Sequence, residues 1–253
     1  MSTFFEGTTP LVVAHRGFAD AVPENTLEAF EKAVTLGVDI LETDVHGSAD
    51  GQAIIAHDPD LTRVASLPHT ISALSLKDIQ KVDLGGARMP TLAQALNEFP
   101  NHRFSIDIKD DLAIEPAVKA IKTARAEDRV MLASFSPSRL DAVRSQLPGS
   151  VVAGTARHVG PAWLSHLISL KTGVSRALLG IDALFIPPRA YGLPLLTSRF
   201  IEMVNDAGVS LGAWTINDEA EMARYWSSGV RAIVTDRSDV ALAVRARLAS
   251  PTP

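Results

Sequence analysis

Short apolar segments rich in β-branched residues alternate with amphipathic helical patterns along the chain, and this alternation restricts the possible folds more than any other feature. The expected strands are Leu11–Ala14, Val38–Val45, Phe104–Ile108, Val130–Ala133, Val151–Ala153, Ala183–Ile186, Val209–Ala213 and Ala232–Val234. The expected helices lie near residues 25–36, 91–98, 112–126, 137–146, 161–171, 197–206, 218–227 and 238–248. This order is typical of parallel strands joined by crossover helices.

Eight strand–helix pairs predict an α/β protein folded as a closed (β/α)8 barrel, the TIM barrel. The length of 253 residues suits one barrel of this kind. No linker divides the sequence, so we expect residues 1–253 to form a single domain. Residues 47–90 interrupt the alternation and are expected to form a short insertion after the second strand. This insertion holds an extended run that ends at His57 and a short helix near 75–82.

Composition excludes several classes of protein. The net charge of −5 argues against a nucleic-acid-binding protein, because such proteins normally carry a basic face. There is no cysteine, so disulfides and thiol chemistry are absent. The segment MSTFFEGTTP lacks the basic and apolar regions of a signal peptide, and no apolar run approaches the roughly 18 residues of a transmembrane helix. We therefore expect a cytoplasmic protein without stable membrane insertion, and its oligomeric state stays open.

Acidic side chains on the second expected strand indicate a metal site. Strand alternation places Glu42, Asp44 and His46 on one face. Two carboxylates so close together repel each other unless a cation lies between them. Hard divalent cations take oxygen ligands, so the pair predicts a site for Mg²⁺ or Ca²⁺. His46 is explained equally well as a neighbour of this site or as polar packing.

Other ionisable side chains follow the ends of the same strands. His15 and Arg16 come directly after the first expected strand, and His57 ends the extended run of the insertion. Alternation places Asp107 and Lys109 on one face of the third expected strand. Active sites of such barrels lie at the C-terminal ends of the strands, so we expect these side chains to meet there.

Several residues have a purely structural interpretation. Asn25 is a good N-cap for the first helix, with Glu28 as its capping-box partner, and this role explains it fully. Asp236 is expected to form a turn or cap before the last helix. Trp214 follows the seventh expected strand and fits the core or the wall of a substrate site equally well.

Four short motifs occur in a fixed order: HRG at 15–17, PENT at 23–26, ETD at 42–44 and HD at 57–58. Each is weak alone, but together they resemble the glycerophosphodiester phosphodiesterase family, whose barrel is phosphatidylinositol-phospholipase-C-like. The match is dense over residues 11–63 and thinner beyond. The resemblance implies metal-dependent hydrolysis of glycerophosphodiesters, such as glycerophosphocholine and glycerophosphoethanolamine, to glycerol 3-phosphate and an alcohol.

The resemblance also implies roles for individual residues. The family usually has a glutamate as third carboxylate ligand where this chain has Asp107, so a cation must lie closer to the third strand or bind through water. Which histidine is the acid stays open, as does the choice between attack by water and attack by a glycerol hydroxyl. The implied roles are catalytic for His15 and His57, substrate-binding for Arg16, Lys109 and Trp214, metal-binding for Glu42, Asp44 and Asp107, and supporting for Glu24, which Arg16 is expected to hold.

Two alternatives to this function remain, both with a small-molecule ligand. The first is a lysophospholipase D-type phosphodiesterase, which acts on a substrate with a lipid tail. A long apolar groove would favour this activity, but the 47–90 insertion is short and mostly polar. The second is a catalytically silent barrel that binds phosphorylated metabolites. Loss of either histidine or of the acidic pair would favour that barrel, and all four residues are present.

Overall fold

The computed structural model describes residues 3–6 and 10–250. Within these residues, eight parallel strands follow one another side by side in the order β6, β5, β4, β2, β1, β11, β10 and β7. They are β1 (Leu11–Ala14), β2 (Ile40–Gly47), β4 (Arg103–Ile108), β5 (Val130–Ala133), β6 (Val151–Val152), β7 (Ala183–Ile186), β10 (Ser210–Ala213) and β11 (Ala232–Thr235). A parallel bridge between Ala153 and Ala183 joins the two ends of this series. The predicted (β/α)8 barrel is confirmed, and each predicted strand is present within two residues of its expected ends.

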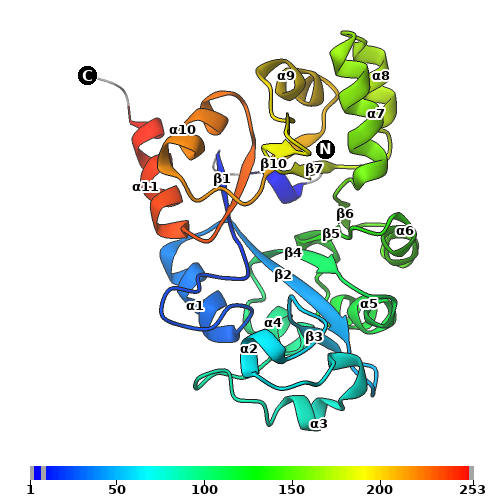
Figure 1. Cartoon of the computed structure of the whole chain (residues 1–253), viewed down its shortest axis with the longest axis vertical. Coiled ribbons are helices and arrows are strands. Elements are labelled where there is room, and N and C mark those ends of the chain that lie inside the picture. The colour runs from blue at the N-terminus through cyan, green and yellow to red at the C-terminus, as the bar shows by residue number, and fades with distance from the viewer. Residues whose placement is uncertain (1–2, 7–9, 251–253) are drawn as a thin grey trace.

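Helices surround the strands, as Figure 1 shows. They are α1 (Leu27–Leu36), α4 (Leu92–Glu98), α5 (Ile114–Thr123), α6 (Pro137–Gln146), α7 (Ala156–Leu167), α8 (Lys171–Ala177), α9 (Ser198–Asp206), α10 (Glu219–Ser227) and α11 (Ser238–Ala249). The helices pack on the outer faces of the strands through large apolar side chains. The ring of Phe30 on α1, for example, meets Phe104 of β4 edge-on, with ring centroids 6.0 Å apart.

Apart from the apolar side chains between helices and strands, a separate apolar cluster fills the inside of the barrel and closes one of its ends. Phe4 and Phe5 of the 3₁₀ helix η1 (Thr3–Phe5) are buried in this cluster together with Val13 and Ile40. Arg103, at the start of β4, donates to the backbone carbonyl of Phe4 at 2.8 Å. The N-terminal end of the barrel is thus plugged, which leaves the C-terminal ends of the strands for a site.

The insertion has an apolar cluster of its own. It contains β3 (Ala53–Ile55), which pairs antiparallel with the end of β2, and the short helices α2 (Thr62–Ala65), η2 (Ile71–Ala73) and α3 (Leu76–Ile79). The members of the cluster are Ile54, Ala56, Leu61, Ile71, Ile79, Val82, Leu84, Ala87 and Met89. Because β3 is tied to the C-terminal half of β2, the insertion holds His57 beside the mouth of the barrel.

The prediction of one helix near residues 161–171 is wrong. Helix α7 begins at Ala156 and contains Pro161 in its interior, and the separate helix α8 follows it. A proline is usually found in the first turn of a helix, where its missing N–H is tolerated, but Pro161 lies in the second turn of α7. The actual start is supported by the ring of His158, which accepts the N–H of Thr155 at 3.1 Å. The small hairpin of β8 (Arg189–Ala190) and β9 (Leu193–Pro194) was also not predicted.

None of the helices in the described part of the chain is long and apolar enough to cross a membrane.

Candidate active site

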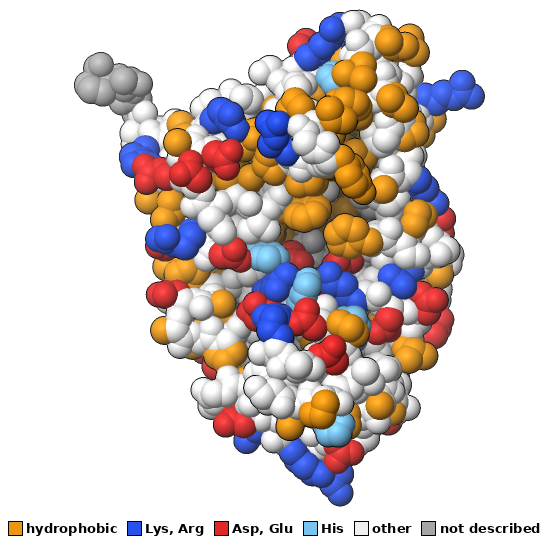
Figure 2. Space-filling model, viewed as in Figure 1, with side chains coloured by type: hydrophobic (Ala, Val, Ile, Leu, Met, Phe, Trp, Pro, Cys, Tyr) orange, Lys and Arg blue, Asp and Glu red, His pale blue; other side chains and the backbone are white. Residues whose placement is uncertain are grey.

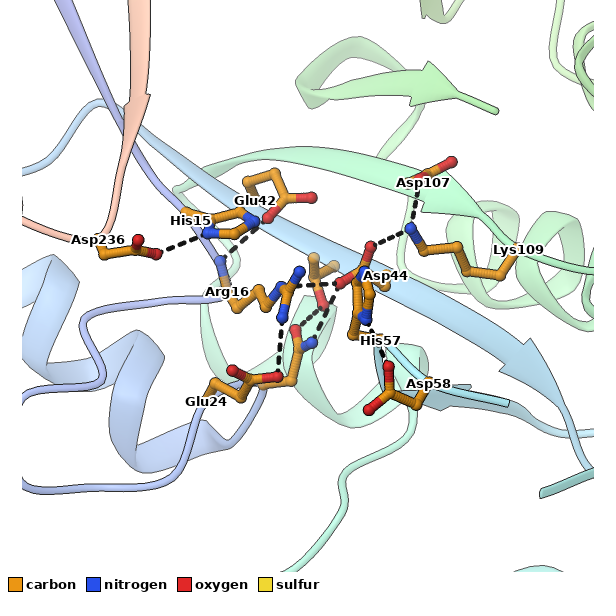
Figure 3. A network of polar contacts seen from close by, with 12 residues as sticks. His15, Arg16, Glu24, Glu42, Asp44, His57, Asp58, Asp107, Lys109 and Asp236 are labelled. Atoms are coloured by element: carbon orange, nitrogen blue, oxygen red, sulfur yellow. Dashed lines mark hydrogen bonds and ion pairs between the residues drawn. The ribbon is translucent and has the colours of Figure 1, made fainter. Parts of the chain in front are cut away.

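The C-terminal ends of the barrel strands carry the candidate active site. Figure 2 shows a hollow in this face, with hydrophobic side chains along its upper edge and charged side chains and histidines along its lower edge. Figure 3 shows side chains from β2, from β4 and from the segments that follow β1, β3, β4 and β11 pointing toward one another. Every predicted site residue except Trp214 belongs to this network.

Three acidic side chains come from adjacent positions on β2 and β4. The parallel register places Asp44 directly beside Asp107, and Glu42 lies two residues earlier on β2. The ammonium group of Lys109 lies between the aspartates, 2.8 Å from Asp44 Oδ1 and 2.7 Å from Asp107 Oδ2. Asp107 and Lys109 therefore share one face, as strand alternation predicted.

The protein itself neutralises these carboxylates incompletely. Burial, together with the charge of Asp44, raises the pKa of Glu42 to about 8. Burial also raises the pKa of Asp107, although Lys109 opposes the shift. The second oxygen of Asp107, Oδ1, is buried and has no hydrogen-bond partner among the described residues. An additional cation here would favour the ionised carboxylates and give this oxygen a partner.

The chemistry of these donors fits a hard divalent cation, because all of them are carboxylate oxygens. As the side chains stand in residues 3–6 and 10–250, no group of three or more His, Asp or Glu residues is arranged to hold a metal ion. Two carboxylate oxygens of the acidic group, one from Asp44 and one from Asp107, already bind the ammonium of Lys109. A metal ion would share these two residues with Lys109.

The loop after β1 holds Arg16 in a tight turn. Arg16 has a left-handed backbone conformation, with φ of 55°, and its N–H donates to Glu42 Oε2 at 3.0 Å. Its guanidinium donates to Glu24 Oε1 at 3.0 Å, which confirms the predicted pairing with Glu24. The next residue, Gly17, has φ of 82°, and a Cβ there would lie 2.8 Å from the backbone of Ala29. Only glycine lets this loop approach α1 so closely.

The assignment of Asn25 as the helix N-cap is wrong. The N-cap is Thr26, whose hydroxyl accepts the N–H of Ala29 at 3.2 Å. Asn25 instead has φ of 56° and turns its amide toward β2. There it donates to Asp44 Oδ2 at 3.2 Å and accepts from Thr43 Oγ1 at 2.8 Å. The Asn25 amide therefore orients the side chain of Asp44. The preference of asparagine for helix N-caps led to the wrong assignment.

Asp236 lies in the bend between β11 and α11, as the turn interpretation predicted, but its interpretation as a helix cap is wrong. Helix α11 has Arg237 as its N-cap, without a capping side-chain bond. Asp236 Oδ1 lies 2.6 Å from His15 Nδ1, and Oδ2 accepts from Asn217 at 2.7 Å. The bond with His15 lowers the pKa of Asp236. Burial would lower the pKa of His15, but Asp236 and the nearby charge of Glu42 outweigh it, so the pKa is raised.

His57 is held on two sides. Its Nδ1 lies 2.7 Å from Asp58 Oδ1, and its backbone carbonyl lies 3.1 Å from His46 Nε2. The other ring nitrogen of His46 contacts Asp110 at 2.7 Å, and His46 is buried. Of the two interpretations of His46, the structure therefore favours a neighbour of the site, because this ring anchors the backbone of the His57 loop.

Aromatic side chains form another part of the mouth. Trp214 follows β10 and packs partly on the apolar cluster inside the barrel. Its ring meets that of Phe135 edge-on, with centroids 6.1 Å apart, and the Lys109 ammonium lies 5.6 Å from the centre of the Phe135 ring. Phe135 is 72% exposed, which is unusual for a large apolar side chain. The two rings together form an aromatic surface beside Lys109.

Sequence reasoning missed three residues of this arrangement: Asn25, Phe135 and Asp236. Asp236 and Phe135 come one and two residues after a barrel strand, so their positions carried a signal of the kind that identified His15. The partner of each side chain could not be found in the same way, because the contacts join strands far apart in the sequence.

Comparisons with known proteins agree with this geometry. Residues 15–240 match the model of the glycerophosphoryl diester phosphodiesterase family. A protein of Mycobacterium tuberculosis named "Probable glycerophosphodiester phosphodiesterase 2" is 34% identical over 233 residues, which cover 91% of this chain and 88% of that protein. The glycerophosphodiester phosphodiesterase of Caldanaerobacter subterraneus is 30% identical over 241 residues, which cover 89% of this chain and 93% of the relative.

A solved structure shows the same fold. The phosphodiesterase of Oleispira antarctica, in complex with its product sn-glycerol-3-phosphate, superposes with a TM-score of 0.79 over 93% of this chain and 96% of that one, at 23% identity. Identity this low is evidence for the fold alone, whereas the family model and the sequence relatives span most of the chain. The chain therefore belongs to the glycerophosphoryl diester phosphodiesterase family.

Proposed function

We propose that this protein hydrolyses glycerophosphodiesters, such as glycerophosphocholine and glycerophosphoethanolamine, to glycerol 3-phosphate and an alcohol. Family membership over residues 15–240 is the observation that carries the proposal. Sequence relatives with that activity in their names support it. The polar groups at the barrel mouth are those that such a reaction needs.

Arg16 and Lys109 are the groups that we expect to bind the phosphodiester. The substrate is an anion and the whole chain carries a net charge of −5, so local positive charge has to attract it. Both side chains are held by carboxylates, Arg16 by Glu24 and Lys109 by Asp44 and Asp107. Held in this way, they can stabilise negative charge that develops on the phosphoryl oxygens.

We assign a divalent metal ion, Mg²⁺ or Ca²⁺, to Glu42, Asp44 and Asp107. Members of the family generally use a divalent metal ion. The raised pKa of Glu42 and the unpartnered oxygen of Asp107 support the assignment, since both indicate missing positive charge. When bound, the ion supplies positive charge to a non-bridging phosphoryl oxygen.

His15 and His57 are proposed to divide the proton transfers. Asp236 and Asp58 have lowered pKa values and stay ionised, so each accepts a hydrogen bond from the Nδ1–H of the facing ring. This leaves Nε2 of each ring free to take up or give a proton. One ring would accept the proton of the attacking water or glycerol hydroxyl, and the other would protonate the departing alcohol oxygen.

A lysophospholipase D-type activity is the second candidate. A lysophospholipase D of Rattus norvegicus is 29% identical over 145 residues, which cover 51% of this chain and 46% of that protein. Exposed apolar side chains follow two barrel strands, Phe135 after β5 and Tyr191 and Leu193 after β7. These groups would cover part of an acyl chain.

The proposal is tested by turnover of glycerophosphocholine, glycerophosphoethanolamine and lysophosphatidylcholine, with Mg²⁺ or Ca²⁺ and after chelation. A higher kcat/KM for the two glycerophosphodiesters supports the first candidate, and a preference for lysophosphatidylcholine supports the second. The double variant His15→Ala/His57→Ala is the control for contaminating activity. A wild-type protein that turns over none of the three with either ion contradicts both candidates.

Other expectations stay predictions from the sequence. These are the absence of nucleic-acid binding, a cytoplasmic location and the organisation of residues 1–253 as one domain.

A further inference from the structure

Arg63 joins the insertion to the first loop of the barrel. It lies on α2, and its Nε donates to Asp58 Oδ2 while its terminal nitrogen NH2 donates to Glu24 Oε1 at 2.7 Å. Asp58 follows β3, whereas Glu24 belongs to the segment between β1 and α1. One guanidinium thus connects two segments that are far apart in the sequence.

Each carboxylate bound by Arg63 also holds a residue of the active site. Asp58 uses its other oxygen for His57 Nδ1 at 2.7 Å, and Glu24 Oε1 also accepts from Arg16 at 3.0 Å. Figure 3 shows Glu24 beside Arg16 and Asp58 beside His57. The result is a continuous series of charged contacts from the phosphate-binding guanidinium, through Arg63, to the imidazole of His57.

The surroundings of Arg63 indicate that this connection serves orientation more than stability. The Arg63 side chain is 50% exposed, and ion pairs at such positions usually add little to the stability of a fold. Burial opposes ionisation of Glu24 and Asp58, yet the pKa of each is lowered, at Glu24 by Arg63 and then Arg16, and at Asp58 by the hydrogen bond with His57 and then by Arg63. A guanidinium can donate in two directions at once, which an ammonium on a flexible stem does less well.

We propose that Arg63 is a positioning residue, which holds Asp58 and therefore the ring of His57 in a fixed orientation relative to Arg16. Without Arg63, the Asp58 carboxylate would keep, among the described residues, only its contact with His57 and could rotate together with it. The kinetic part of this inference rests on the proposed phosphodiesterase activity. The state of the His57 ring, however, can be measured without any turnover.

The first test compares Arg63→Ala and Arg63→Lys with the wild-type protein on glycerophosphocholine. We expect Arg63→Ala to lower kcat by about 10- to 100-fold, because a misplaced acid–base group loses part of its effect. KM should change by less than about threefold, since Arg16 keeps Glu24 as its partner. Arg63→Lys should recover only part of kcat, because one ammonium cannot replace both hydrogen bonds that the guanidinium makes, to Asp58 and to Glu24.

Arg88→Ala is the matched control. Arg88 lies in the same insertion, its side chain is 56% exposed, and its nearest carboxylate, Asp83, is 3.9 Å away. This variant should keep the wild-type kcat. Arg63→Ala should unfold within about 4 °C of the wild-type protein, as expected for loss of a surface ion pair.

The second test is nitrogen-15 NMR of the histidine rings, with the spectrum of His57→Ala used to assign His57. In the wild-type protein the proton of neutral His57 should reside on Nδ1, facing Asp58. In Arg63→Ala the signals should shift toward the averaged values of a ring that exchanges between tautomers. Arg88→Ala should leave the signals unchanged.

Three results would overturn the inference. They are a kcat of Arg63→Ala within twofold of the control, unchanged His57 signals in Arg63→Ala, and a fall in Tm of more than about 10 °C, which would indicate a structural role. If the wild-type protein hydrolyses no phosphodiester, the proposed function fails, and the NMR comparison still decides whether Arg63 orients His57.

Discussion

Replacement of Asp236 by asparagine tests the pairing of His15 most directly. Asp236 contacts His15 Nδ1 at 2.6 Å through one oxygen and accepts from Asn217 at 2.7 Å through the other. Asp236→Asn keeps the size of the side chain but gives it one donor and one acceptor. Whichever way the introduced amide turns, its NH₂ group faces a donor, either the His15 N–H or the Asn217 amide.

The magnitude follows from the kind of bond and its exposure. A hydrogen bond to a charged group contributes about 1.5–3 kcal/mol, and the Asp236 side chain is 52% exposed, so water can replace part of the loss. The lower limit of about 1.5 kcal/mol corresponds to a roughly tenfold change in rate. We therefore expect Asp236→Asn to lower kcat on glycerophosphocholine by about tenfold.

A second expectation concerns the direction in which the pH profile of kcat/KM moves. The pKa of His15 is raised, because Asp236 and Glu42 outweigh the effect of burial. Without the Asp236 charge this pKa should fall, so the limb of the kcat/KM profile that follows His15 should move to lower pH, whether the ring acts as acid or base. A histidine with a raised pKa stabilises the fold below its unfolded pKa of about 6.5, and this contribution is lost as the pH rises through the folded pKa. The variant should therefore lose stability mainly at acidic pH.

The assay is a pH profile of kcat/KM for the wild-type protein, Asp236→Asn and the control Asp239→Asn. Asp239 lies three residues further on, in the first turn of α11, pairs with Arg237 and has no contact with His15 among the described residues. A profile and rate of Asp236→Asn that match those of the control would refute the role of Asp236 at His15. Thermal unfolding at acidic and alkaline pH checks the stability prediction independently.

Three further predictions concern the metal, the two histidines and the domain organisation. Exhaustive chelation should abolish turnover and added Mg²⁺ or Ca²⁺ should restore it, so full activity in chelator would rule out the metal assignment. His57→Ala and His15→Ala should each lower kcat by about two to four orders of magnitude on glycerophosphocholine, with KM much less affected. A nitrophenyl phosphodiester has a leaving group that needs no proton, so it should partly restore the rate only in the variant that lacks the acid histidine. Near-normal rates on glycerophosphocholine in both variants would mean that the pair is structural. Limited proteolysis should cut the 47–90 insertion before the barrel, whereas two stable fragments that meet near residue 150 would contradict a single domain.

The sequence alone was sufficient for the barrel and for the main polar residues of its mouth. Buried parallel strands are short β-branched runs whose positions can be located locally, and alternation assigns each side chain to a face. The C-terminal ends of parallel strands meet at one edge, and this rule is enough to place Glu42, Asp44, Asp107 and Lys109 together. The helices were less certain, as Pro161 shows, because tertiary contacts permit an interior proline that local preference excludes.

The partners of these residues were decided only by the tertiary structure. His15 and Asp236 are 221 residues apart and meet because closure of the barrel pairs β1 with β11, Leu11 lying beside Ala232. Asn25 was assigned to a helix cap from local preference alone, whereas its amide contacts Asp44 on the neighbouring strand. Sequence periodicity predicts the face of a strand on which a side chain lies. The contacts that this side chain makes depend on which strands are brought together when the barrel closes.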